Sequence, residues 1–322
     1  MKLYSVTILC VAILALGFKS FETMPESTYI GPTTAVELGK ELFMDSILSE
    51  DFSISCASCH IPEFAFSDTS AVSLGVRGQK GNRNTPSAMN MLSRPFFFWD
   101  GRAATLEEQT LMPIENPVEM NLPIDSAVAR LIRSRYYTES FNRVYGKKPS
   151  KTLLADAIAA FERTLETSSA HDRFSMGDSS VMSASAIRGL EIFNVKGKCF
   201  DCHFGPDLTG DEFRNIGLFD NLKDKDKGRF DFSKDTVDIG KFKVPSLRNI
   251  AVTGPYMHDG SFKTLREVIE YYNEPDRFRP HGMNRDSLLA KPLGLTEQDI
   301  QDLEAFMNAL TAPQFLHLLK KN

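Results

Sequence analysis

Apolar residues recur every three or four positions in two stretches of the chain, 154–165 and 303–310, and this is the spacing of one face of an α-helix. Thr296 and Asp299, three positions apart, precede the second stretch and are typical of a helix N-terminus. Elsewhere proline and glycine interrupt the pattern, so we expect long loops, with one short strand at 232–237. The apolar residues of the two helix faces are Leu154, Ile158, Phe161 and Leu165, and Leu303, Phe306, Met307 and Leu310.

The N-terminus has a hydrophobic pattern of a different kind. Residues 3–18 contain no charged side chain and lie between Lys2 and Lys19. An apolar run of this length is typical of the central region of a signal peptide, and it is shorter than the ~20 residues that span a bilayer. We therefore expect residues 1–23 to be a signal peptide for export, in preference to a retained membrane anchor.

The composition limits the classes of function. Hydrophobic residues make up 42% of the 322 positions and charged residues 25%, which is ordinary for a folded chain long enough for two domains. Lys and Arg number 37 against 42 Asp and Glu, so the formal charge is −5. This balance argues against a protein that binds nucleic acid through a basic surface.

Four of the five cysteines belong to two motifs of the same form. Cys10 lies in the predicted signal peptide, and the others lie in C-A-S-C-H at 56–60 and C-F-D-C-H at 199–203. The pattern C-x-x-C-H indicates covalent haem attachment, in which two thiols bind the porphyrin and the histidine binds the iron. We therefore expect two covalently bound haem c groups. Their expected ligands are Cys56, Cys59, His60, Cys199, Cys202 and His203.

Two other interpretations of these motifs fit less well. A zinc site could use both cysteine pairs, but the pairs lie far apart in the chain and each has its own adjacent histidine. Each pair could also form a disulfide in an exported protein, but His60 and His203 would then have no role.

The sequence repeats itself around the two motifs. The pattern G-x-E-x-F precedes each motif, P-S-x-x-N follows it, and an Asp-Gly pair follows 14 residues after the proline in both halves. The simplest explanation is an all-α protein with two tandem cytochrome c-like domains, each around one haem c. We place the N-terminal domain at 24–170 and the C-terminal domain at 171–322. The repeated segments are 39–43 and 189–193, 86–90 and 245–249, and 100–106 and 259–265.

The repeat also predicts that the two haems differ. The thirteenth residue after the repeated aspartate is Pro113 in the first half and Tyr272 in the second. Proline offers no side-chain ligand, whereas a tyrosine oxygen can bind ferric iron. If both positions face the iron, the first haem is open to a small molecule and the second is closed, which suits peroxide activation at one and electron transfer at the other.

The chain after the signal peptide resembles the bacterial dihaem cytochrome c peroxidases and shares two features with their MauG-like branch. That resemblance implies a periplasmic enzyme whose N-terminal haem reduces hydrogen peroxide to water, while the C-terminal haem relays electrons from a small c-type cytochrome or a cupredoxin. Many such peroxidases form homodimers. The motifs that carry the resemblance are the two C-x-x-C-H sequences and residues 78–86, 98–102, 118–120, 228–230, 244–249 and 255–260.

The resemblance also implies roles for individual residues. Trp99 matches an indole between the haems, and Gln109 and Glu119 match residues that line the peroxide pocket. A carboxylate there can take a proton from one peroxide oxygen and return it to the other. A calcium ion between the domains is also implied, and its ligands match Asn84, Thr253 and Pro255.

Two departures set this chain apart from many members of that family. The Ser-Leu-Gly stretch is followed by Val76 and not by the histidine that closes the peroxidatic haem, so we expect the first haem to react without prior reduction. The second is Tyr272 in place of a methionine ligand, although Met257, Met283, a histidine or no ligand remain alternatives. Both departures are shared with the MauG-like branch. A MauG-like oxidase of a protein or organic substrate, and a non-catalytic dihaem electron carrier, therefore stay as alternative functions.

Overall fold

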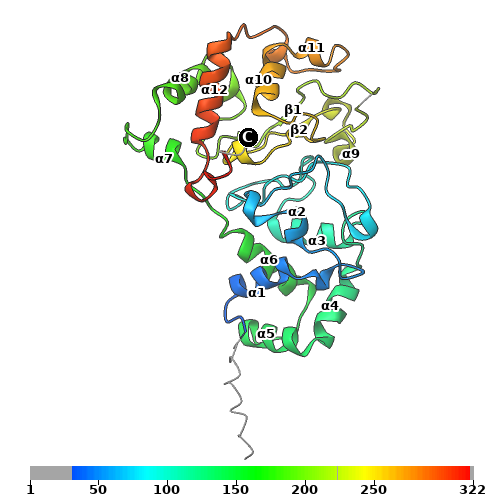
Figure 1. Ribbon diagram of the computed structural model, residues 1–322. Helices are drawn as coiled ribbons and strands as arrows, with labels where there is room; N and C mark the ends of the chain where they lie inside the picture. Colours follow the sequence, from blue (N-terminus) through cyan, green and yellow to red (C-terminus); the bar gives the residue numbers. More distant parts are fainter. Residues whose placement is uncertain (1–30, 223, 320–322) are drawn as a thin grey trace, which may run out of the picture. The chain divides into compact units, whose positions relative to one another are not determined.

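Helices joined by long loops make up nearly all the regular structure of the computed structural model, which describes residues 31–222 and 224–319 (Figure 1). The predicted signal peptide, residues 1–23, lies outside the described residues. Within those residues, no helix has both the length and the apolar character needed to cross a membrane. The helices are α1 (Ala35–Met44), α2 (Cys56–Cys59), α3 (Leu106–Glu115), α4 (Ile124–Arg133), α5 (Arg135–Tyr145), α6 (Lys151–Glu162), α7 (Ala170–Ser175), α8 (Ala184–Asn194), α9 (Phe230–Ser233), α10 (Leu265–Asn273), α11 (Pro275–Phe278) and α12 (Glu297–Ala309).

Both helices that the apolar pattern predicts are present. The helix α12 begins with the expected capping box, in which the Thr296 hydroxyl accepts from the N–H of Asp299 and the Asp299 carboxylate accepts from the N–H of Thr296. The helix α6 begins after Ser150, whose hydroxyl caps the N–H of Leu153. It ends at Glu162, so Leu165 is buried in the following turn and not on the helix itself.

One close helix crossing organises each half of the chain. The helices α1 and α6 pack together in the N-terminal half, and α8 and α12 do so in the C-terminal half (Figure 1). A Cβ at Gly39 of α1 would overlap the carbonyl oxygen of Ala157, and one at Gly189 of α8 would overlap that of Asp302. Glycine at these positions lets the two backbones touch, which explains why the G-x-E-x-F segment repeats.

The predicted strand at 232–237 is wrong. This segment contains the end of α9 and a 3-10 turn at Thr236–Asp238, in which the Asp235 carboxylate accepts from the N–H of Val237. Such local bonds compete with pairing to a second strand. The named strands of the described residues are β1 (Phe213–Arg214) and β2 (Phe242–Lys243), which pair antiparallel.

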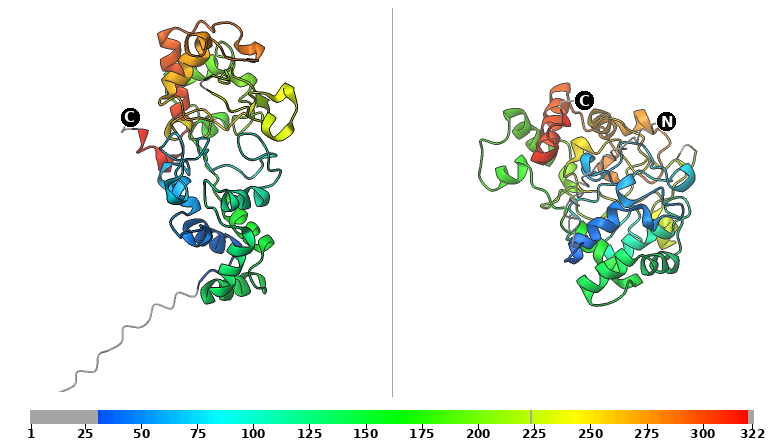
Figure 2. Two further views of the ribbon diagram at one scale, coloured as in Figure 1. Left: turned by 90° about the vertical axis from the view of Figure 1, so that its right-hand side faces the viewer. Right: turned by 60° about the horizontal axis from the view of Figure 1, so that its bottom comes forward.

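Loops from the N-terminal half and loops from the C-terminal half lie side by side in the fold (Figure 2). Arg83 joins them, because its guanidinium donates to Asp100 of the N-terminal half at 2.7 Å and to Asp226 of the C-terminal half at 2.6 and 2.8 Å. The N–H of Lys243 also donates to the carbonyl oxygen of Trp99 at 2.7 Å. Bidentate Arg–carboxylate pairs of low exposure hold orientation well, so this junction fixes how the two repeats face each other.

Candidate functional site

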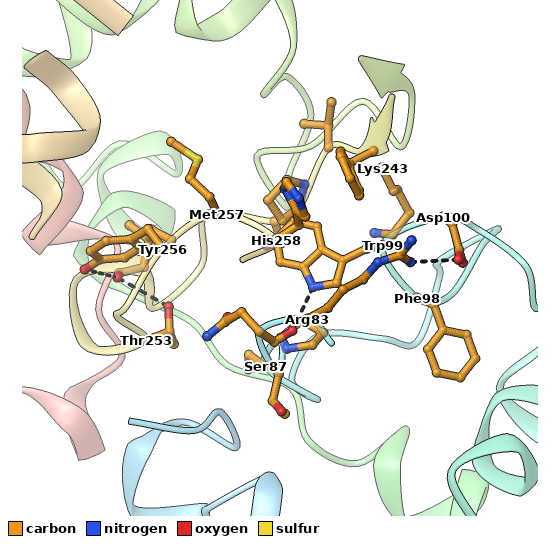
Figure 3. A pocket seen from close by; sticks show the side chains of 18 of the residues that line it. Arg83, Ser87, Phe98, Trp99, Asp100, Lys243, Thr253, Tyr256, Met257 and His258 are labelled. Atoms are coloured by element: carbon orange, nitrogen blue, oxygen red, sulfur yellow. Dashed lines mark hydrogen bonds and ion pairs between the residues drawn. The ribbon is translucent and has the colours of Figure 1, made fainter. Parts of the chain in front are cut away.

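A continuous cavity of about 1040 Å³ reaches both C-x-x-C-H motifs. All four cysteines and both motif histidines line it, and so do residues from the loops that join the two halves. Figure 3 shows a part of this cavity, with Trp99 and His258 in it. The folded chain therefore leaves a large space at the two places where the sequence predicts a haem.

The first motif is held by the short helix α2. The Ser55 backbone and side chain pair with Ser58 at its start, and the N–H of His60 donates to the carbonyl oxygen of Cys56 at 2.8 Å. The His60 Nδ1 lies 3.1 Å from the carbonyl oxygen of Phe66. A ring nitrogen facing a carbonyl carries the proton, so Nε2 keeps the lone pair that binds a metal. Burial lowers the pKa of His60, which keeps the ring neutral.

The second motif repeats this geometry. The N–H of His203 donates to the carbonyl oxygen of Cys199 at 2.9 Å, and its Nδ1 lies 3.0 Å from the carbonyl oxygen of Leu208. Burial lowers the pKa of His203 to about 4. Both histidines are therefore oriented by a backbone carbonyl and held neutral, which is the state that an iron ligand needs.

These residues fit a covalently bound haem better than the two alternatives. The four cysteines are free thiols in the described part of the chain, two at each end of the cavity. No group of three His, Cys, Asp or Glu side chains that could hold a metal ion occurs in residues 31–222 and 224–319, so the paired motifs do not form a zinc site there. When bound, a haem would supply redox chemistry at iron, with each C-x-x-C pair as its thioether anchor and the adjacent histidine as its axial ligand.

Pro113 and Tyr272 occupy the same position in equivalent helices. Thr105 caps α3 and Thr264 caps α10, and Pro113 and Tyr272 are each the eighth residue of their helix. Both line the cavity. Burial raises the pKa of the Tyr272 hydroxyl, and the thiols of the second motif add to this effect. The repeat therefore places Pro113, whose side chain has no atom that can bind iron, in one half and the phenol of Tyr272 in the other.

The alternative methionines for the second haem differ in position. Met257 lines the cavity, whereas Met283 is 44% exposed and is not among the lining residues. Tyr271, which directly precedes Tyr272 in the chain, is fully buried, and its hydroxyl donates to the carbonyl oxygen of Ile216 at 2.6 Å. Of two adjacent tyrosines, one is a core residue and the other faces the cavity.

Gln109 and Glu119 both line the N-terminal part of the cavity, close to Pro113 in sequence. The amide of Asn116 donates to the Glu119 carboxylate at 2.7 Å. Burial raises the pKa of Glu119, and the nearby Arg102 and the Asn116 amide oppose that rise. A partly desolvated carboxyl of this kind can exchange a proton with a bound molecule.

Trp99 and its repeat equivalent, His258, line the cavity where the two halves meet (Figure 3). The Trp99 indole Nε1–H donates to the carbonyl oxygen of Asn84 at 2.8 Å. His258 is buried, stacks on Phe242 with ring centroids 3.8 Å apart, and has its Nε2 3.2 Å from the Asp224 carboxylate. These contacts orient both rings, and the N–H of Asn84 donates to the carbonyl oxygen of His258 at 2.7 Å, which connects the two halves.

Asn84, Thr253 and Pro255, the predicted calcium ligands, also line the cavity. The Asn84 amide nitrogen donates to the carbonyl oxygens of Ser70 and Ala71 at 3.3 and 3.2 Å, so its Oδ1 takes no part in these bonds. The three residues come from both halves and line the same cavity.

Sequence reasoning passed over several charged residues of the cavity wall, among them Glu162 and Lys243. Glu162 is 7% exposed and Lys243 lies beside Asp211 with 3.9 Å between Nζ and Oδ1. Burial lowers the pKa of Lys243 to about 8. The internal repeat could have identified Glu162, because Phe161-Glu162 is equivalent to Phe306-Met307 and a carboxyl therefore replaces a thioether.

Comparison with known proteins agrees with this architecture. The family model for di-haem cytochrome c peroxidases matches residues 33–180, and the cytochrome c model matches residues 186–311. The chain is 36% identical to the cytochrome-c peroxidase IdrP1 of Denitromonas iodatirespirans, over 87% of this chain and 82% of that protein. It is 37% identical to the methylamine utilization protein MauG of Methylorubrum extorquens, over 94% of this chain and 85% of that protein.

A solved structure is similar over its whole length. The crystal structure of a MauG-like protein associated with microbial copper homeostasis aligns with a TM-score of 0.79 and 32% identity, covering 93% of this chain and 98% of that chain. Two tandem cytochrome c-like domains with one C-x-x-C-H motif each define a dihaem c-type protein. The chain belongs to the di-haem cytochrome c peroxidase family, whose members include MauG-like proteins, and it is an oxidoreductase of that family.

Proposed function

We propose that this protein reduces hydrogen peroxide to water at the haem of its N-terminal half, with electrons that enter through the haem of its C-terminal half. The observation that carries this proposal is the difference between Pro113 and Tyr272 at one helix position, together with Glu119 and Gln109 at the Pro113 side of the cavity. A proline offers no ligand atom there, and a carboxyl that can exchange a proton and an amide that can form hydrogen bonds line the same part of the cavity.

The protein's own residues have separate tasks in this reaction. Glu119 would take a proton from one peroxide oxygen and return it to the other, which departs as water. Gln109 offers an amide that orients the peroxide by hydrogen bonding. Tyr272 would hold the iron of the second haem through its phenol oxygen, because it stands at the helix position that Pro113, which has no ligand atom, takes in the first half.

Trp99 connects the two halves in this proposal. Its indole is fixed by the bond to Asn84, and its carbonyl accepts from Lys243 of the C-terminal half. A rigid aromatic ring that lines the cavity between the two motifs is well placed to carry electrons from one haem to the other. We further infer that Asn84, Thr253 and Pro255 bind one Ca²⁺ ion that stabilises this junction.

The supply of electrons and the location belong to the same proposal. A small c-type cytochrome or cupredoxin delivers the electrons, since relatives named cytochrome-c peroxidase share 33–36% identity with most of this chain. We propose that the enzyme works in the periplasm, directed there by the predicted signal peptide at 1–23.

A second candidate function is favoured by a specific residue. Val76 follows the Ser-Leu-Gly stretch where the resemblance places a histidine in many peroxidases, and the chain is 37% identical to MauG of Methylorubrum extorquens. A MauG-like oxidase acting on a protein or organic substrate would also need an N-terminal haem that is open at rest. The third candidate, an electron carrier without catalysis, requires both haems to have two protein ligands.

Electron paramagnetic resonance of the fully oxidised holoenzyme, followed by peroxide turnover, separates the three. We expect one high-spin and one low-spin ferric signal, and steady-state turnover with a reduced c-type cytochrome. Two low-spin signals without turnover would leave the electron carrier. A long-lived doubly oxidised state that reacts slowly with small donors would instead favour the MauG-like oxidase.

A further inference from the structure

Glu162 places a carboxyl group in the wall of the N-terminal part of the cavity. It is the last residue of α6, it is 7% exposed, and it lines the cavity together with Ile158, one turn earlier on the same helix. Cys56 of the first haem motif lines the same cavity, and the charge of Glu162 contributes to the raised pKa of its thiol. None of the roles assigned above uses this carboxyl.

The framework of the fold does not require an acid at this position. The two helix crossings superpose Ala157 on Asp302 and Phe161 on Phe306, because Gly39 and Gly189 contact these pairs in the same way. The residue after each phenylalanine lines the cavity in both halves. It is Glu162 in one repeat and Met307 in the other, so a thioether meets the same packing demand without a charge.

The surroundings of Glu162 leave it without a fixed partner. Within residues 31–222 and 224–319 no donor or cation pairs with its carboxylate, and the adjacent Arg163 is engaged with Glu107 of α3 at 2.7 Å. The helix α1 presents Gly39 and Phe43 to α6, which carry no charge.

Two charged residues near Glu162 shift its pKa in opposite directions. Burial raises its pKa to about 8, Arg163 lowers the pKa and Glu107 raises it. A carboxyl in this setting is neutral at low pH and can lose its proton when positive charge is added nearby.

We propose that Glu162 takes up and releases one proton in the N-terminal cavity as the haem bound there is reduced and oxidised. One electron enters the cavity from a donor, and Glu162 binds one proton from solvent, so the charge of the buried site stays constant. On oxidation the electron leaves to the acceptor and the proton returns to solvent. The C-terminal part of the cavity, with Met307 at the equivalent position, lacks this proton exchange.

The inference rests on haem binding, which is part of the proposed function, but not on peroxide turnover. A holoenzyme with the proton coupling described below and no peroxidase activity would overturn the proposed enzyme and keep this inference. A holoenzyme with peroxidase activity and without the proton coupling would overturn this inference and keep the proposed enzyme.

Potentiometric titration of the holoenzyme at several pH values from 6 to 10 tests the proposal, with the two haems followed at separate wavelengths. We expect the potential of the N-terminal haem to fall as pH rises, by up to about 59 mV per pH unit for one proton per electron. In Glu162→Gln and Glu162→Met this dependence should be lost around pH 8, whereas Met307→Gln should leave it unchanged. Equal slopes in the parent and Glu162→Gln would overturn the proposal.

Two further measurements cover variants that fold poorly or fail to bind haem. Met307→Glu should give the C-terminal haem the pH dependence that it lacks in the parent. In the unmodified holoenzyme, the redox-difference infrared spectrum should show a carboxylic-acid C=O band that appears on reduction and shifts in D₂O. The band should persist in Glu119→Gln, which separates the two acids of the cavity. Absence of the band in the parent would overturn the proposal independently of any variant.

Discussion

The backbone N–H of Val76 donates to the carbonyl oxygen of Glu119, with 2.8 Å between nitrogen and oxygen. Val76 is fully buried and does not line the cavity. It stands where many peroxidases have a histidine, and its hydrogen bond holds the backbone of Glu119 in place. The adjacent Gly75 packs so closely on this segment that a Cβ would overlap the carbonyl oxygens of Val118 and Glu119.

This contact predicts the effect of Gly75→Ala. The added methyl pushes on the backbone of Glu119, and a displacement of about 1 Å in a catalytic group can cost on the order of 10²-fold in rate. We expect a slower reaction with peroxide in stopped-flow measurements and normal haem content. Gly81→Ala, in the same loop, is the matched control, because its Cβ would lie 3.4 Å from the nearest atom. Equal rates in the two variants would contradict the prediction.

Replacing the acid itself should have a larger and more specific effect. Glu119→Gln keeps the shape and the contact with Asn116 but cannot transfer a proton, so we expect peroxide cleavage to slow by about 10²–10⁴-fold. Haem content and the resting spectrum should not change. The exposed Glu63→Gln is a control for loss of one negative charge in the same half. Parent-like cleavage by Glu119→Gln would assign the proton transfer to another group.

The pH dependence should report the same carboxyl. Because burial raises the pKa of Glu119 above 4.5, the active carboxylate is lost as pH falls through a value higher than that of an ordinary glutamate. The kcat/KM for peroxide should decline on this acidic side. Removing the positive charge in Arg102→Gln should raise the pKa further and move the decline to higher pH. A decline that stays in place in Arg102→Gln would point to a different acid.

Tyr272 and Tyr271 offer a matched pair of variants for the second haem. If Tyr272 binds the iron, Tyr272→Phe changes the low-spin resonance signal, and Tyr272→Met raises the potential because a thioether favours ferrous iron more than a phenolate does. Tyr271→Phe removes the hydroxyl that donates to Ile216, so it should cost about 1 kcal/mol of stability and leave the spectrum unchanged. An unchanged spectrum in Tyr272→Phe would transfer the role to Met257 or to another group.

The two helix crossings should be equally sensitive to a methyl group. Gly39→Ala and Gly189→Ala each force a side chain onto a backbone carbonyl, so we expect losses above the roughly 1–3 kcal/mol that is usual for over-packing. Thermal or denaturant unfolding of the holoenzyme measures the loss, with Gly81→Ala as the control. If either half tolerated the change without loss of stability, the close crossing would not be essential to its fold.

Sequence patterns predicted the long helices because these depend on neighbours three and four residues apart. The helices α6 and α12 lie where the apolar faces indicated, and the capping box at Thr296 is present. The strand expected at 232–237 failed because six residues carry too little periodicity to outweigh local bonds such as the one from Val237 to Asp235. The short strands β1 and β2 lie 29 positions apart in the chain and pair only once the loops are folded, so no local pattern indicated them.

The sequence by itself determined the two haem motifs, the internal repeat and the Pro113–Tyr272 difference, because spacing and residue type are enough to specify covalent attachment and register. Only the tertiary structure decided which charged groups share the cavity. Glu162 and Cys56 line the same cavity, Gly75 packs on the backbone of Glu119, and Arg83 connects Asp100 to Asp226. These contacts join segments that lie far apart in the chain, and burial, which sets the protonation of the cavity acids, exists only after the chain has packed around them.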